Sequence, residues 1–217
     1  MANTRYNILF EDDWILVIDK PSGMLVIPTP KNEKNTLTDL INMELDSRGV
    51  SINAYPCHRL DRETSGLIIY AKGKKMQGLI MEQFKNRLVK KTYAAFVHGF
   101  VKNPQGVINK PIFSNNKKKY LDAITHYKVI KRNNAFSVLE VMPVTGRTNQ
   151  IRIHFKGIAH PLVGESVYIF RKDFALKFKR VALHAKNIVF QHPVTGKKLD
   201  LSSPLPKDME EFLLFRS

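Results

Sequence analysis

Short apolar segments bounded by turn-forming residues recur along this chain, and they constrain its fold more than any other feature. Runs of this length, rich in branched and aromatic side chains, are typical of β-strands. We expect strands at Ile8–Phe10, Trp14–Asp19, Leu67–Ala71, Thr92–Val97, Ile124–Ile130, Phe136–Val141, Val181–His192 and Lys198–Leu201. Helical spacing of apolar residues occurs at Leu37–Leu45, Met76–Phe84, Thr148–Gly157 and Met209–Leu213. Because strands and helices do not alternate as in βαβ units, the pattern predicts an α+β fold with a mixed, largely antiparallel sheet and flanking helices.

The first predicted helix has signals at both of its ends. Thr36 and Asp39 have the spacing of a capping box, in which each side chain binds the backbone N–H of the other residue. Gly49 is suited to the left-handed conformation that ends many helices. The helix is therefore expected between these residues.

Length and composition indicate one intracellular domain. The chain has 217 residues, of which 43% are hydrophobic, and it contains no linker or internal repeat, so we expect a single domain over residues 1–217. No apolar run is long enough to span a bilayer, and the first residues lack the layout of a signal peptide. The one cysteine, Cys57, cannot form an internal disulfide. These features predict a cytoplasmic protein, which we expect to be a monomer.

Positive charge is concentrated in the later part of the chain. The net charge is +16, and residues 1–60 hold 6 Lys and Arg against 8 Asp and Glu, whereas residues 61–217 hold 29 against 11. The densest basic stretches are Lys72–Lys91, Lys117–Lys119 within an expected exposed loop at 114–119, and Arg171–Arg180. Any one stretch is equally typical of a solvated surface. Together they favour a nucleic acid as the partner over a membrane.

An aspartate between two arginines stands out in the segment His58–Gly66, which reads HRLDRETSG. Cations on both sides favour the ionised form of Asp61, and the small residues that follow predict a turn. The charge pattern alone is also typical of a surface loop whose aspartate caps the next element or pairs with an arginine. The chain has no glycine-rich nucleotide loop and no metal-ligand spacing, so we expect no cofactor and no metal.

Five segments, in order and nearly end to end, resemble the RluA-type pseudouridine synthases. Besides His58–Gly66, which is the most specific, they are Phe10–Pro28 (around LVIDKPSGMLVIP), Lys90–Gly99 (KKTYAAFVHG), Gly146–His154 (GRTNQIRIH, continuing to HPLVG) and Val181–Gly196 (VALHAKNIVFQHPVTG). The resemblance implies a pseudouridine synthase-like fold with a central RNA-binding cleft. It also implies conversion of uridine to pseudouridine in a stem-loop of rRNA or tRNA. That reaction exchanges a C–N glycosidic bond for a C–C bond without redox change, so it demands no cofactor.

The resemblance assigns roles to individual residues. Asp61 matches the catalytic aspartate, which either attacks C1′ of the ribose or removes the C2′ proton, and it must be ionised in both routes. Arg152 matches the arginine that pairs with this carboxylate, and Tyr93 the tyrosine that stacks on the target base. Arg59 matches the residue that fills the gap left by the flipped base, and Leu183 is expected against the other face of the uracil. Without the resemblance, Arg152 would be a surface arginine, Tyr93 a core tyrosine, Arg59 a phosphate or carboxylate contact outside a pocket, and Leu183 a core leucine.

The chain departs from the family pattern at two positions, and two other function classes stay open. Asn149 stands where histidine is usual and Glu165 where aspartate is common, and neither is expected to touch the inferred chemistry. No N-terminal S4-type RNA-binding extension is expected either. The main alternative is a noncatalytic RNA-binding or ribosome-associated protein. A hydrolase would need a second carboxylate as general acid, for which Glu63 is the nearest candidate.

Overall fold

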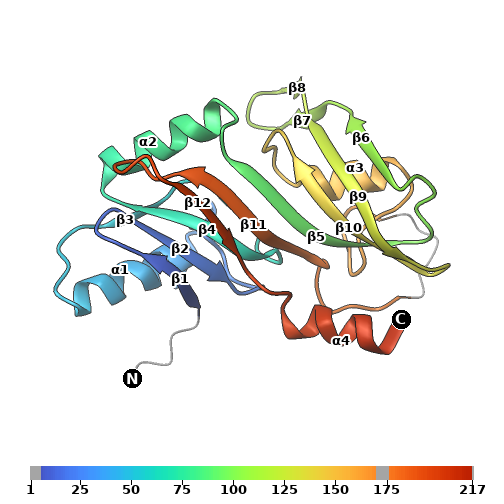
Figure 1. Cartoon of the computed structure of the whole chain (residues 1–217), viewed down its shortest axis with the longest axis horizontal. Coiled ribbons are helices and arrows are strands. Elements are labelled where there is room, and N and C mark those ends of the chain that lie inside the picture. The colour runs from blue at the N-terminus through green and yellow to red at the C-terminus, as the bar shows by residue number, and fades with distance from the viewer. Residues whose placement is uncertain (1–5, 170–175, 217) are drawn as a thin grey trace. The chain divides into compact units, whose positions relative to one another are not determined.

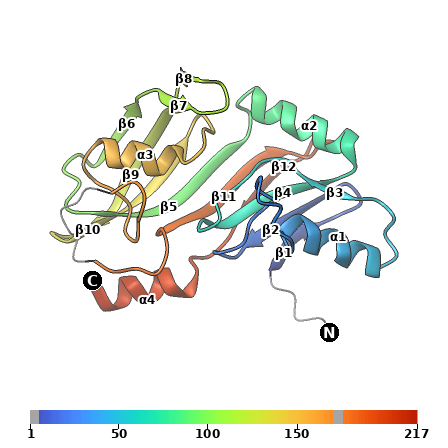
Figure 2. The same cartoon turned by 180° about the vertical axis from the view of Figure 1, so that it is seen from behind.

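The computed structural model describes residues 6–169 and 176–216, which divide into two units by the contacts of their backbones. Unit 1 contains residues 1–89 and 187–203, and unit 2 contains residues 90–186 and 204–217. Figures 1 and 2 show their elements from opposite sides. The basic stretch Arg171–Arg180 lies partly outside the described residues.

Unit 1 consists of antiparallel strands and two helices. Its elements are β1 (Asn7–Glu11), β2 (Ile15–Lys20), α1 (Leu37–Ser47), β3 (Ala54–Pro56), β4 (Ser65–Lys72), α2 (Lys74–Lys85), the end of β11 (Leu183–Gln191) and β12 (Lys198–Ser202). Strand β2 lies between β1 and β4, β3 pairs with β4, and β12 pairs with β11, all in antiparallel register. Every residue of β4 is buried, which confirms the strand predicted at Leu67–Ala71. Its apolar side chains pack with Ile15 and Val17 of β2 and with Ile80 of α2.

The ends of α1 follow from the signals in its sequence. Thr36 is the N-cap, and its side chain and that of Asp39 form the predicted capping box. Arg48 is the C-cap, and Gly49 follows it with a φ of 75°, in the left-handed region that glycine adopts without strain. In α2 only Ile80 is buried, whereas Leu79, which lies within the predicted helical pattern Met76–Phe84, is 38% exposed.

Unit 2 contains antiparallel sheet strands, a separate hairpin and two helices. Its elements are β5 (Lys90–His98), β6 (Gln105–Asn109), β7 (Ile112–Ser114), β8 (Lys119–Leu121), β9 (Ile124–Arg132), β10 (Phe136–Pro143), α3 (Gln150–Gly157), the start of β11 and α4 (Lys207–Arg216). Four of its strands pair in the antiparallel order β5-β10-β9-β6. Figure 2 shows α3 across the face of β9 and β10, where the ring of Phe155 meets that of Tyr127 edge to face at 5.7 Å. Helix α4 buries Met209 and Phe212 against β5 and β10.

Two elements of unit 2 differ from the sequence-based expectation. Helix α3 begins at Gln150 and not at Thr148, because Asn149 has a φ of 54° and a left-handed residue cannot continue an α-helix. The segment 114–119, expected as a loop, is the turn and strand ends of the hairpin β7–β8. The predicted α+β class with largely antiparallel pairing is confirmed. Among the described residues no helix is long and apolar enough to cross a membrane.

Candidate active site

Asp61 lies in unit 1, on the loop that joins β3 to β4. Its side chain is partly buried, and its backbone carbonyl accepts a hydrogen bond of 3.1 Å from the N–H of Thr64, which forms the predicted turn. Thr64 and Ser65 are buried. Thr64 and Ser65 therefore connect the turn directly to β4. This connection fixes the position of Asp61 relative to that strand.

The end of β2 and the residues after it hold this loop in place. Lys20 is fully buried, and its Nζ donates to the carbonyl oxygens of Pro21 at 2.9 Å, Met24 at 2.8 Å and Arg62 at 3.2 Å. The N–H of Gly23 also donates to the Arg62 carbonyl, at 2.8 Å, and Ser22 Oγ donates to that of Glu63, at 2.7 Å. A buried ammonium needs such acceptors, because burial without them is costly. The two residues that follow Asp61 are thus anchored through their backbone.

The other side chains of the motif have distinct surroundings. Arg62 forms an ion pair of 3.0 Å with Glu33 at the protein surface. His58 accepts a hydrogen bond of 3.0 Å on Nε2 from the N–H of Ile69, and its ring lies 4.8 Å from that of Phe84. Burial raises the pKa of Cys57 to about 12, so its thiol stays protonated and packs as an apolar side chain. Both flanking arginines are exposed to solvent.

Arg152 projects from α3 in unit 2 and is held by three side chains. Its Nε and Nη2 donate to the two carboxylate oxygens of Glu165, each at 2.7 Å, and its Nη1 donates to Asn149 Oδ1 at 3.1 Å. The guanidinium carbon lies 5.1 Å from the centre of the Tyr168 ring, and Tyr168 Oη accepts from Asn149 Nδ2 at 3.0 Å. The Arg152 side chain is 11% exposed and that of Glu165 is 0% exposed. This geometry fixes the plane of the guanidinium.

Glu165 is itself stabilised as a carboxylate. Burial raises its pKa, but hydrogen bonds from Arg152 and from the backbone N–H groups of Val167 and Tyr168 outweigh this effect and hold the pKa below its usual value. Its Oε1 accepts from the N–H groups of Ser166, Val167 and Tyr168 at 3.0, 2.9 and 3.1 Å. Asn149 and Glu165, which were not expected to touch the inferred chemistry, therefore both bind Arg152. Both positions depart from the family pattern, and this departure is the signal in the sequence that could have drawn attention to them.

The predicted site residues form two groups, one in each unit. Asp61 and Arg59 belong to unit 1, and Tyr93, Arg152 and Leu183 belong to unit 2. Tyr93 on β5 is 9% exposed and Leu183 at the start of β11 is 3% exposed. The pairing of Asp61 with Arg152 and the central cleft stay predictions. Among the described residues no group of three His, Cys, Asp or Glu side chains is arranged to hold a metal ion.

Comparison with known proteins gives matches over most of this chain. The family model for RNA pseudouridylate synthase matches residues 14–157. An uncharacterized RNA pseudouridine synthase of Bacillus subtilis, YlyB, is 36% identical over 95% of this chain and 71% of its own length. The dual-specificity RNA pseudouridine synthase RluA of Vibrio cholerae is 35% identical over 89% of this chain and 83% of its own. The ribosomal large subunit pseudouridine synthase D of Xanthomonas campestris is 34% identical over 95% of this chain and 68% of its own.

A solved structure shares the fold at lower identity. Human RNA pseudouridylate synthase domain containing 4 superposes with a TM-score of 0.81 at 23% identity, over 96% of this chain and 92% of the human chain. The arrangement of strands and helices is therefore the fold of that protein.

Proposed function

Since this chain belongs to the RNA pseudouridylate synthase family and is an RNA isomerase, we propose that it converts particular uridines of rRNA or tRNA and that Asp61 is its catalytic residue. The RNA classes follow from relatives whose names specify the large ribosomal subunit or a dual specificity. The assignment of the catalytic role to Asp61 rests on the anchored backbone of its loop. The backbone on its C-terminal side is anchored by buried Lys20, by Gly23 and by Ser22, so the carboxylate is presented from a fixed position.

The chemistry requires one ionised carboxylate at this position. The bond between N1 and C1′ breaks, the bond between C5 and C1′ forms, and the proton lost from C5 is balanced by the proton gained at N1. Asp61 either attacks C1′ or removes the C2′ proton to give a glycal intermediate. Arg152 pairs with the carboxylate in this proposal and keeps it charged. Its orientation by Glu165 and Asn149 supports that role, because a fixed guanidinium presents its remaining donors in one direction.

Three further residues bind the substrate in the same proposal. Tyr93 stacks on the target uracil, and Leu183 packs against the other face of the ring. Arg59 enters the space that the flipped base leaves in the RNA. Its exposure supports this assignment, because an arginine that inserts into RNA must be accessible from solvent.

Mapping of pseudouridine in total RNA tests the proposal directly. In cells that lack the gene, we expect pseudouridine to disappear from one or a few positions of rRNA or tRNA, and the wild-type protein to restore it. Purified protein should modify the same positions in unmodified RNA without added nucleotide or metal, because the isomerisation needs no energy input. An unchanged map would contradict the proposed substrates. RNA binding without any product would favour the noncatalytic alternative.

Charge at the hairpin turn is expected to contribute to RNA binding. Replacing Lys117, Lys118 and Lys119 by glutamine should weaken binding to the mapped RNA and flatten the slope of log affinity against log salt. For single-stranded RNA, the magnitude of this negative slope decreases by about 0.7 for every phosphate that the protein no longer neutralises. The measurement is a titration of RNA at several salt concentrations.

A matched variant separates local phosphate binding from net charge. Replacing exposed Lys197, Lys198 and Lys207 by glutamine removes the same number of charges elsewhere. We expect this control to keep the wild-type slope. Equal slopes for the two triple variants would show that the hairpin binds no phosphates of its own.

A further inference from the structure

The hairpin β7–β8 presents two aromatic rings to solvent. Phe113 and Tyr120 are directly opposite each other in the antiparallel register, so both side chains stand on the same face. They are 50% and 70% exposed, and their ring centroids lie 5.3 Å apart in an edge-to-face arrangement. Such a pair stabilises the hairpin itself. The exposure leaves additional ring surface, above all that of Tyr120, without protein cover.

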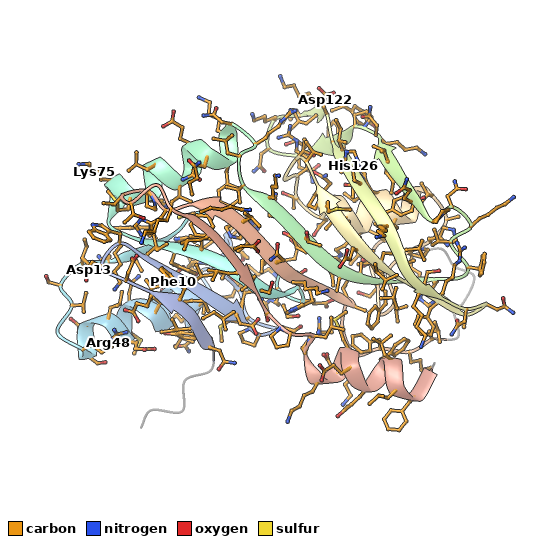
Figure 3. All side chains as sticks on the ribbon, viewed as in Figure 1. Phe10, Asp13, Arg48, Lys75, Asp122 and His126 are labelled. Atoms are coloured by element: carbon orange, nitrogen blue, oxygen red, sulfur yellow. The ribbon has the colours of Figure 1, made fainter. Side chains whose placement is uncertain are left out.

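The hairpin is attached to the helix that carries Arg152. Before β7, the carbonyl of Lys110 lies 2.9 Å from Nε2 of His154 on α3, and Lys110 Nζ donates to the Gly157 carbonyl at 3.3 Å. After β8, the carbonyl of Asp122 accepts from Arg147 Nε at 3.0 Å. Figure 3 labels Asp122 at the end of the hairpin. Both ends of the hairpin segment are thus fixed to α3 or to the residues just before it.

The charge of the hairpin fits a polyanion. Residues 110–122 contain Lys110, Lys117, Lys118 and Lys119 against one acidic residue, Asp122. Lys118 lies at the turn with a φ of 49°. A duplex hides the faces of its bases, so exposed rings within a basic surface find stacking partners only among unpaired bases. Neither a neutral ligand nor an acidic protein explains the aromatic rings and the lysines together as directly.

We propose that Phe113 and Tyr120 form a stacking platform for unpaired bases of the RNA substrate, with Lys117–Lys119 on the neighbouring phosphates. The inference rests on the proposed function and adds to it, because it predicts a single-stranded segment close to the target uridine. The attachment to α3 fixes the platform in the unit that also holds Arg152 and Tyr93. Bases held there would orient the loop of the RNA without being read individually, since every base has a face that stacks.

Two RNA probes and a double leucine variant test the platform. The probes are single-stranded oligouridylate and a blunt RNA duplex of equal length. Replacing both Phe113 and Tyr120 by leucine keeps apolar side chains but removes the rings, and it should lower affinity for oligouridylate by about 5- to 150-fold for each base that no longer stacks. The salt slope should not change, because no charge is removed, and duplex binding should stay at the wild-type level.

Controls separate stacking from loss of structure. Tyr120→Phe keeps the ring and should bind as wild type, and Phe100→Leu removes a 48% exposed ring elsewhere in unit 2 and should have no effect. Equal affinity of the double leucine variant and of Phe100→Leu for oligouridylate would overturn the platform. A parallel loss of duplex binding would also overturn it, because it would indicate a distorted hairpin. Pseudouridine formation by the wild-type protein is a separate measurement, so a failed platform leaves the proposed function intact.

Discussion

Asp61→Asn is expected to abolish pseudouridine formation while RNA binding stays at the wild-type level. Asparagine has the same shape as aspartate, but its neutral amide neither attacks C1′ nor removes a proton from C2′. The loop itself should persist, because its anchors are the backbone carbonyls of Arg62 and Glu63. We expect turnover to fall by at least about 10⁴-fold, as when an enzyme loses its nucleophile or base. Single-turnover assays with the mapped RNA measure this loss, and filter binding measures affinity.

Glu63→Gln is the matched control for this prediction. It neutralises a carboxylate two positions away in the same turn, and its backbone contact with Ser22 does not involve the side chain. We expect its turnover to be of the same order as that of the wild type. Equal and severe losses in both variants would point to a pair of carboxylates, as in a glycosidase. Measurable turnover by Asp61→Asn would remove Asp61 from its proposed role.

Local signals predicted those parts of the fold that depend on neighbouring residues. The capping box of Thr36 and Asp39 and the apolar run Leu67–Ala71 act within a few residues, and both elements are found where they were expected. Helix α3 starts later than predicted because the left-handed Asn149 is itself bound to Arg152 and Tyr168. A backbone conformation set by tertiary contacts leaves no periodic signal in the sequence.

Pairing between separate segments explains why other features could not be predicted. Phe113 and Tyr120 are seven positions apart and become neighbours only through the register of β7 and β8. Arg152 on α3 and Glu165 in the loop after that helix likewise meet across 13 positions. The motif identified Arg152, but nothing local to Glu165 indicated that its carboxylate would be buried against that arginine. Positions that depart from a family motif within its own segments therefore merit particular attention.

Glu165→Gln is expected to reduce turnover without weakening RNA binding. Glutamine offers one acceptor oxygen where the carboxylate offers two, and its amide N–H groups face the donors of Arg152. The guanidinium then loses its fixed orientation, and misplacement of such a group by about 1 Å costs about 10²-fold in rate. We expect kcat to fall by about that factor with KM for RNA near the wild-type value. Glu165→Asp restores a carboxylate and should recover a large part of the loss.

Stability and its pH dependence distinguish positioning from unfolding. Removing one partner of a buried ion pair destabilises a protein by about 3 kcal/mol. Because the folded-state pKa of Glu165 is lowered, its contribution is complete above the pKa of an unfolded glutamate and is lost as pH falls through the lowered value. The difference in Tm between wild type and Glu165→Gln should therefore shrink in acid. Met209→Ala empties a buried site on α4, away from Arg152, and costs at least about 2 kcal/mol.

These two variants together decide what Glu165 does. Both are destabilised, so a loss of kcat caused by general loosening of unit 2 would appear in Met209→Ala as well. We expect the wild-type kcat in Met209→Ala at a temperature where both variants are folded, and the reduced kcat only in Glu165→Gln. If the two rates agree, Glu165 is a structural residue. If Glu165→Gln alone is slow and Glu165→Asp recovers, the Glu165 carboxylate acts on turnover by orienting Arg152.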